Sequence, residues 1–175
     1  MAGRLFHISE KAGIALFEPR PAPSLDAGVS GNAVWAIDED HLPNYLLPRD
    51  CPRVTYAAGV NTSAADIERW FDDTDARRIV IIEQRWLPLA SRAVLHVYEL
   101  PPDTFALADP SAGYFISREA VLPIATREVS DPLGEILARG CEVRAVPDLW
   151  PIRDGVMGST LDYSIIRMRN AARMG

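Results

Sequence analysis

The chain has 175 residues, of which 48% are hydrophobic and 24% are charged, and its formal net charge at pH 7 is -6. A chain of this length can bury a core without disulfides or metals, so we expect a single domain over residues 1–175. The acidic charge argues against nonspecific nucleic-acid binding, which depends on cationic side chains at phosphates. Among the 18 cationic residues only Lys11 is a lysine, and arginine favours planar pairing with carboxylates or phosphates.

The N-terminal sequence MAGRLFHISEKAG lacks the apolar stretch of a signal peptide, and no later run is long enough to cross a membrane. Cys51 and Cys141 are too far apart for a zinc or redox motif and are expected to be free thiols. We therefore expect a cytoplasmic protein without membrane association.

The chain begins with a predicted strand over residues 4–9, which places His7 and Ser9 on one face and a more apolar set on the other. A proline-rich loop follows over residues 18–32. A short apolar strand is predicted over residues 33–37.

A helix is predicted next, capped by Asp38 or Asp40, carrying His41 and Tyr45 and ending at Pro48. The middle of the chain is mostly β, with strands at residues 53–56, 78–83, 93–100, 104–108, 113–117 and 121–129. We expect the two strongest of these, RIVIIE and AVLHVYEL, to be neighbours in one sheet. The second alternates, so that His96 and Tyr98 are placed on a solvated side.

Two helices have clear boundary signals. Thr62 or Ser63 caps the amphipathic segment ADIERWF, whose apolar face is expected to pack inward. Asp131 and Pro132 open the other helix, and Gly140 ends it.

The C-terminal part is predicted to contain a strand at residues 142–146, a loop at 147–154 and a helix at 160–172 with apolar residues in helical register. The order of all elements, neither alternating βαβ nor all strand, favours an α+β class with mostly antiparallel, split sheets and a few peripheral helices.

No metal motif, phosphate-binding glycine loop or dinucleotide fingerprint is present, so we predict no metal. Three patches stand out: LFHISE, VWAIDEDHLPNYLLPRDCPRV and GYFISREAVLP. In the first, His7 can donate to a ligand hydroxyl from a rigid strand, with Ser9 beside it. The favoured alternative is a half-buried strand histidine bonded to the backbone.

In the second patch, Arg49 and Arg53 flank a proline-stiffened loop and can clamp a phosphate or carboxylate. The equal alternative is an internal ion pair that holds the loop. A minor option is a nucleophilic Cys51, activated by His7 or His41 and with its pKa lowered by the arginines.

In the third patch, Tyr114, Ser117 and Glu119 project from a strand and the turn after it, with Arg118 able to pair with Glu119. A carboxylate beside a ribose can stabilise an oxocarbenium-like transition state. The alternative is a surface strand end with a salt bridge of little worth.

Together the segments LFHIS, VWAID, YLLPRDCPRV and YFISREAVLP resemble a family of uncharacterised bacterial proteins of this length, known only as a domain of unknown function. This resemblance covers the whole chain. It implies no activity by itself.

The order of elements is also similar to the ADP-ribosyltransferase-like fold. That resemblance implies that His7 contacts the adenosine ribose of NAD and that Glu119 completes the catalytic site. The tyrosine that stacks on nicotinamide is matched best by Tyr45, with Trp35 or Tyr114 as alternatives.

The resemblance therefore implies a protein that binds NAD or an ADP-ribose nucleotide. If it is an enzyme, it transfers the ADP-ribosyl group by breaking the glycosidic bond at the nicotinamide ribose. Arg49 or Arg53 would take the pyrophosphate, and Ser9 and Ser117 would line the nucleotide site. Two other hypotheses stay open: a noncatalytic ligand-binding or interaction module, and a hydrolase that depends on Cys51.

Overall fold

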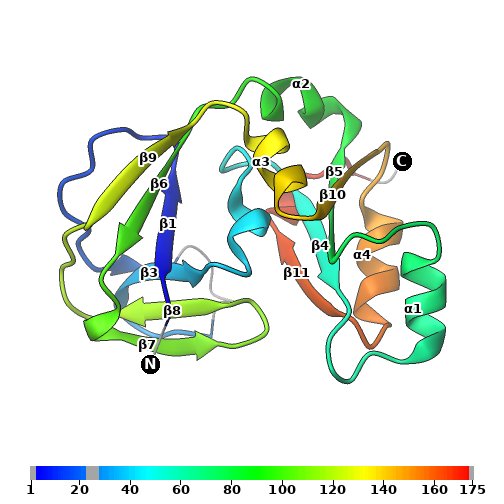
Figure 1. The fold of residues 1–175 in the computed structure, drawn as a ribbon, viewed down its shortest axis with the longest axis horizontal. Coiled ribbons are helices and arrows are strands. Elements are labelled where there is room, and N and C mark those ends of the chain that lie inside the picture. The colour runs from blue at the N-terminus through cyan, green and yellow to red at the C-terminus, as the bar shows by residue number, and fades with distance from the viewer. Residues whose placement is uncertain (1–2, 23–27, 174–175) are drawn as a thin grey trace. The chain divides into compact units, whose positions relative to one another are not determined.

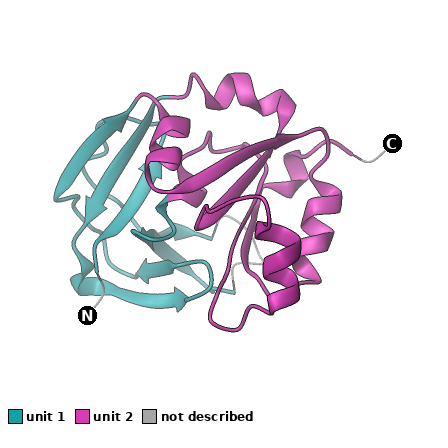
Figure 2. Cartoon of the chain, turned by 45° about the vertical axis from the view of Figure 1, so that its right-hand side comes forward, with its two compact units in different colours: residues 1–42, 94–129 teal, residues 43–93, 130–175 magenta. Residues whose placement is uncertain are grey.

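The computed structural model describes residues 3–22 and 28–173. The chain divides into two compact units, each assembled from two segments of sequence (Figure 2). Unit 1 comprises residues 1–42 and 94–129, and unit 2 comprises residues 43–93 and 130–175. The predicted α+β class with mainly antiparallel sheets is confirmed. The single domain over residues 1–175 stays a prediction, and part of the predicted loop at 18–32 lies outside the described residues.

Unit 1 is built on an antiparallel sheet in the order β7-β8-β3-β1-β6-β9, with the short β2 added to β3. Figure 1 shows β1 between β3 and β6. The strands are β1 Leu5–Ser9, β2 Arg20–Pro21, β3 Asn32–Asp38, β6 Leu95–Leu100, β7 Phe105–Asp109, β8 Tyr114–Ser117 and β9 Ala125–Val129. All were predicted except β2, although the segment 121–124 is not part of β9 and contributes only an isolated bridge between Val121 and Phe17.

The core of unit 1 lies on the sheet face that carries Leu5, Val34 and Leu100, and the loop after β1 covers it with Phe17 and Ile14. Tyr98 belongs to this core and is fully buried, so the predicted solvated side of β6 is wrong at this position. The Tyr98 hydroxyl donates to the Lys11 carbonyl at 2.6 Å and accepts from Ile14 N at 3.2 Å. Tyr98 can be buried because these two bonds satisfy its hydroxyl group. The same bonds anchor the loop that covers the core.

Unit 2 contains a second sheet in the order β10-β5-β4-β11. Its strands are β4 Arg53–Ala57, β5 Arg78–Glu83, β10 Cys141–Val146 and β11 Asp162–Ile166. β5 and β10 run parallel and the other pairs are antiparallel. The expected pairing of the two strongest strands is wrong, because β5 lies in this sheet whereas β6 lies between β1 and β9 in unit 1.

Four α-helices occur in the described part of the chain: α1 Ala64–Phe71, α2 Leu87–Ala90, α3 Pro132–Ala138 and α4 Trp150–Met157. The caps of α1 and α3 are as predicted, since Ser63 accepts from Asp66 N and Asp131 accepts from Gly134 N. α1 and α4 pack on one face of the unit 2 sheet (Figure 1), where Trp70 and Val156 join the core of Val54 and Ile81. Only Ile67 of the expected inward face stays exposed.

Of the C-terminal predictions, the strand at 142–146 is confirmed by β10, Cys141–Val146, whereas the predicted loop and helix after it are wrong. The expected helix at 160–172 is the strand β11 followed by a short 3₁₀ helix, Met168–Asn170, and the expected loop at 147–154 contains the start of α4. The apolar residues Leu161 and Ile165 do reach the core, but Leu161 lies just before β11 and Ile165 lies within it, and all five residues of this strand pair with β4. Tertiary pairing thus overrides a local pattern that also fits a helix.

The predicted helix after Asp38 is likewise replaced by a 3₁₀ helix, Leu42–Tyr45. Asp38 still acts as a local cap, because its Oδ1 accepts from His41 N at 2.9 Å and from His41 Nδ1 at 2.7 Å. None of the helices within residues 3–22 and 28–173 has the length and apolar character required of a membrane span.

Candidate functional site

His7 lies in β1 and is half-buried. Its Nδ1 is 2.9 Å from the main-chain oxygen of Trp35, and since a carbonyl can only accept, Nδ1 carries the proton of this bond. Its ring also contacts Phe17, with 4.8 Å between the centroids. His7 is therefore the half-buried, backbone-bonded strand histidine expected as the alternative to a ligand role, and the bond to Trp35 holds its imidazole in one orientation.

Ser9 and Ser117 share a sheet face with His7. The register shows this, because His7 pairs with Tyr98, Leu5 pairs with Leu100, and side chains alternate between the faces along each strand. Ser117 pairs with Val34, which belongs to the same core as Leu5 and Tyr98. The structure therefore brings three predicted site residues to one face.

Trp35 and Tyr114 lie on the opposite face. Trp35 is next to the core residue Val34 along β3, so its side chain points the other way. Its ring meets that of Tyr114 edge-on, with 5.5 Å between the centroids. These two alternatives for the nicotinamide-stacking residue are therefore separated from His7 by the sheet.

The turn after β8 holds Glu119. The buried Ser117 hydroxyl lies 2.8 Å from the Thr104 hydroxyl and accepts from Glu119 N at 3.2 Å. Arg118 donates to the main-chain oxygen of Asn32, and no ion pair joins it to Glu119 among the described residues, so the pairing expected between them is wrong. The Glu119 carboxylate is exposed and bonds to no side chain in the described part of the chain.

Phe17 connects His7 with this turn. Its ring contacts His7, and its backbone pairs with Val121, two residues after Glu119, through bonds of 2.9 and 2.8 Å. We call the set His7, Ser9, Phe17, Ser117 and Glu119 the His7 corner. It collects a first-strand histidine and a late glutamate in one part of unit 1.

Tyr45, Arg49 and Arg53 belong to unit 2. Arg53 is almost fully buried, and its guanidinium donates to the main-chain oxygens of Asn44, Pro48 and Cys51 at 3.1, 3.1 and 2.6 Å. It therefore holds the loop before β4 in place. Arg49 is exposed and Tyr45 is half-buried. The nucleotide-binding roles of all three residues stay predictions.

Cys51 is fully buried, and both cysteines are free thiols as predicted. Burial raises the pKa of the Cys51 thiol to about 11, outweighing the opposite effect of Arg53. Arg53 acts in the expected direction, but the expected net lowering of the Cys51 pKa is wrong, because the effect of burial is larger. Since the thiolate is the nucleophile, this environment does not favour a Cys51-dependent hydrolase.

A cavity in unit 2 was not anticipated from the sequence. It has a volume of about 280 Å³ and is lined by residues of α1, α4 and the sheet, including Arg69, Trp70 and Asp72. The sequence marks Trp70 only as part of an amphipathic helix face, and nothing in that pattern distinguishes a cavity wall from a packed core residue. The described residues contain no group of three or more side chains able to hold a metal ion.

The fold and these sites define an α+β protein with an antiparallel sheet in one unit and a mixed sheet in the other. The chain belongs to DUF6886, a family of unknown function whose model matches residues 6–171. The uncharacterised family expected from the sequence motifs is thereby confirmed. No curated protein and no solved structure matches the chain.

Proposed function

We propose that the protein binds NAD or a related ADP-ribose nucleotide at the His7 corner of unit 1. The observation that supports this proposal is the link through Phe17, which contacts His7 and forms an isolated β-bridge with Val121, two residues after Glu119. A histidine of fixed orientation and an exposed carboxylate are thus both found in this corner.

In this proposal His7 holds a ribose hydroxyl, with its imidazole oriented by the bond from Nδ1 to the Trp35 carbonyl. Ser9 lies on the same face, and Ser117 fixes the turn that carries Glu119. NAD supplies a glycosidic bond between nicotinamide and ribose. The Glu119 carboxylate stabilises the positive charge that develops at the ribose carbon as this bond weakens.

The test is calorimetric titration of the purified protein with NAD, with ADP-ribose and nicotinamide as comparison ligands. We expect saturable binding of NAD that becomes about tenfold weaker or more in His7→Ala, because a ligand hydrogen bond is lost. Circular dichroism of the variant verifies that it is folded. No binding at millimolar NAD, or unchanged binding in folded His7→Ala, would contradict the proposal.

The catalytic part has a separate test, since NAD turnover is measured by nicotinamide release. Glu119→Gln is expected to keep NAD binding and lose release, whereas Glu128→Gln, an exposed glutamate of β9, serves as the matched control. Binding without release in the wild-type protein favours the noncatalytic ligand-binding module. Release that persists in Glu119→Gln contradicts the role of that carboxylate.

A further inference from the structure

The cavity of unit 2 has an apolar base. Ile81 of β5 and Val146 of β10 contribute to it from the sheet, and Ile152 contributes from α4. The volume of about 280 Å³ lies just below the range of roughly 300–1,000 Å³ typical of sites for drug-sized ligands. The cavity therefore suits one small molecule with an apolar part.

One wall of the cavity is aromatic. The rings of Trp70 and Tyr56 meet edge-on at 5.2 Å, and the Tyr56 hydroxyl donates to the Trp70 carbonyl at 3.4 Å. α4 approaches this wall closely, since a Cβ added at Gly155 would lie 2.8 Å from the Trp70 ring. The buried indole Nε1–H of Trp70 has no acceptor among the described residues.

One pair of charges at the cavity is already used internally. Arg144 donates to Glu142 at 2.7 Å and to Asp73 at 2.9 Å, and these bonds raise its pKa. Each of these three charged groups therefore already has an ion-pair partner, although two carboxylates on one guanidinium leave the cluster with one net negative charge.

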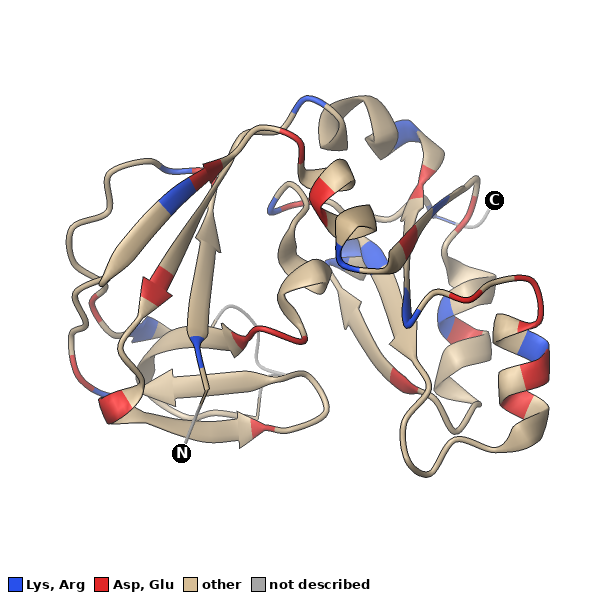
Figure 3. Ribbon diagram, viewed as in Figure 1, with Lys and Arg blue, Asp and Glu red and all other residues tan. Residues whose placement is uncertain are grey.

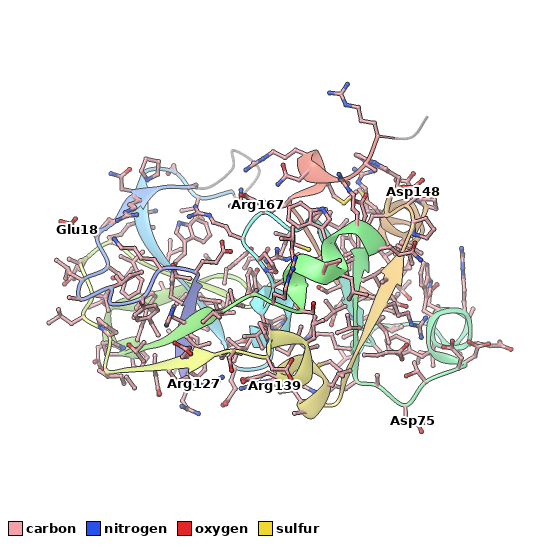
Figure 4. The ribbon with its side chains drawn as sticks, turned by 90° about the horizontal axis from the view of Figure 1, so that it is seen from above. Glu18, Asp75, Arg127, Arg139, Asp148 and Arg167 are labelled. Carbon is pink, nitrogen blue, oxygen red and sulfur yellow. The ribbon has the colours of Figure 1, made fainter. Side chains whose placement is uncertain are left out.

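A second pair of charges at the cavity is not used in this way. The Arg69 guanidinium stacks 5.1 Å from the centre of the Trp70 ring and makes no hydrogen bond or ion pair with a described residue, although its charge contributes to the lowered pKa of Asp66 on the same helix. The Asp72 carboxylate also lines the cavity and makes no hydrogen bond or ion pair with a described residue. Figure 3 shows charges of both signs along α1 and the loop after it, and Asp75, labelled in Figure 4, lies farther along that loop. The cavity thus offers one cation and one anion beside an apolar base.

We propose that this cavity binds a small zwitterion with an apolar body, namely an α-amino acid with an aromatic or branched aliphatic side chain. Arg69 presents a planar set of donors that suits the carboxylate, and its stacking on Trp70 keeps that plane oriented. Asp72 pairs with the ammonium group, and the side chain occupies the base formed by Ile81, Val146 and Ile152. This site is independent of the His7 corner.

The test is calorimetric titration of the full-length protein with L-phenylalanine and L-leucine. Two comparison ligands remove one charge each: 3-phenylpropanoate lacks the ammonium group, and phenethylamine lacks the carboxylate. We expect one molecule of amino acid to bind per chain, with both comparison ligands at least about tenfold weaker, as each loses a charged contact.

The variants Arg69→Gln and Asp72→Asn change exposed side chains and are expected to fold. Each should weaken binding of phenylalanine about tenfold or more, whereas Glu68→Gln, an exposed residue of the same helix that does not line the cavity, should not. The wild-type protein and Asp72→Asn should bind 3-phenylpropanoate equally well, because this ligand has no ammonium group for Asp72 to pair with. The proposal is overturned if neither amino acid binds at millimolar concentration, if 3-phenylpropanoate binds as tightly as phenylalanine, or if either variant binds normally.

Discussion

Two arginines of unit 2 are used in opposite ways. Arg53, the first residue of β4, is buried and directs its guanidinium at three main-chain carbonyls of the preceding segment. Arg69, on α1, is exposed and stacks on an indole ring without any hydrogen bond to the described residues. The comparison shows that burial and nearby acceptors, rather than residue type, decide whether a guanidinium supports the fold or is available to a ligand.

The largest expected effect separates these two roles directly. Arg53→Met should lower the free energy of unfolding by about 3 kcal/mol or more, because buried carbonyls lose their donor at a cost of about 1–3 kcal/mol each. Arg69→Met should change it by less than about 1 kcal/mol, since it loses only an exposed cation–π contact. Urea unfolding of both variants measures the difference, and equal effects would show that the two arginines do not differ as described.

A second prediction extends the comparison to unit 1, where His41 and Asp38 pack over Gly113. Gly113 has a φ of +66°, and an added Cβ would collide with the His41 ring. Gly13 is the matched control, because its φ is +67° and no described atom lies within 4 Å of the position that its Cβ would take. Both substitutions by alanine incur roughly 1–2 kcal/mol of backbone strain.

Gly113→Ala should therefore destabilise unit 1 by about 1–3 kcal/mol more than Gly13→Ala, as an overpacked site does. Thermal or urea unfolding of the two variants checks this. If Gly113→Ala and Gly13→Ala lower the free energy of unfolding equally, the pair of His41 and Asp38 is not held tightly against the β7–β8 hairpin.

The smallest predicted effect concerns Cys51, beside Arg53. The pKa of its thiol in the folded protein is about 11, against an ordinary value of 9.0, so the folded state keeps a proton that the unfolded state releases. The contribution of this thiol to the free energy of unfolding is therefore complete below pH 9 and is lost as the pH rises toward 11. Between pH 8 and pH 10 the loss is about 1 kcal/mol.

Urea unfolding at several pH values measures this loss, with Cys51→Ala as the comparison. In Cys51→Ala the free energy of unfolding should not show the part of the decrease between pH 8 and pH 10 that comes from ionisation of this thiol, whatever the stability of the variant at pH 8. The native thiol should also resist alkylation at pH 8 and react once the protein is unfolded. Rapid alkylation of the folded protein would show that burial does not control this cysteine.

Strands formed by short apolar segments and helices with side-chain caps are predictable from sequence. β1, β5 and the caps at Ser63 and Asp131 are local features, since they depend on neighbouring residues and on short hydrogen bonds. β11 was mistaken for a helix because its apolar spacing fits both structures, and only pairing with β4 distinguishes them. The partner of β5 was missed for the same reason, as strand pairing joins segments distant in sequence.

For the candidate sites the same division holds. The sequence by itself determined the class of fold, the family motifs and the presence of His7 and Glu119 as polar residues in a strand and a turn. Only the tertiary structure decided that Arg53 is enclosed by carbonyls, that Trp35 and His7 lie on opposite sheet faces, and that Arg69 and Asp72 line one cavity. The physical reason is that solvation, charge pairing and cavity shape depend on side chains brought together from distant segments, and no local pattern encodes those distances.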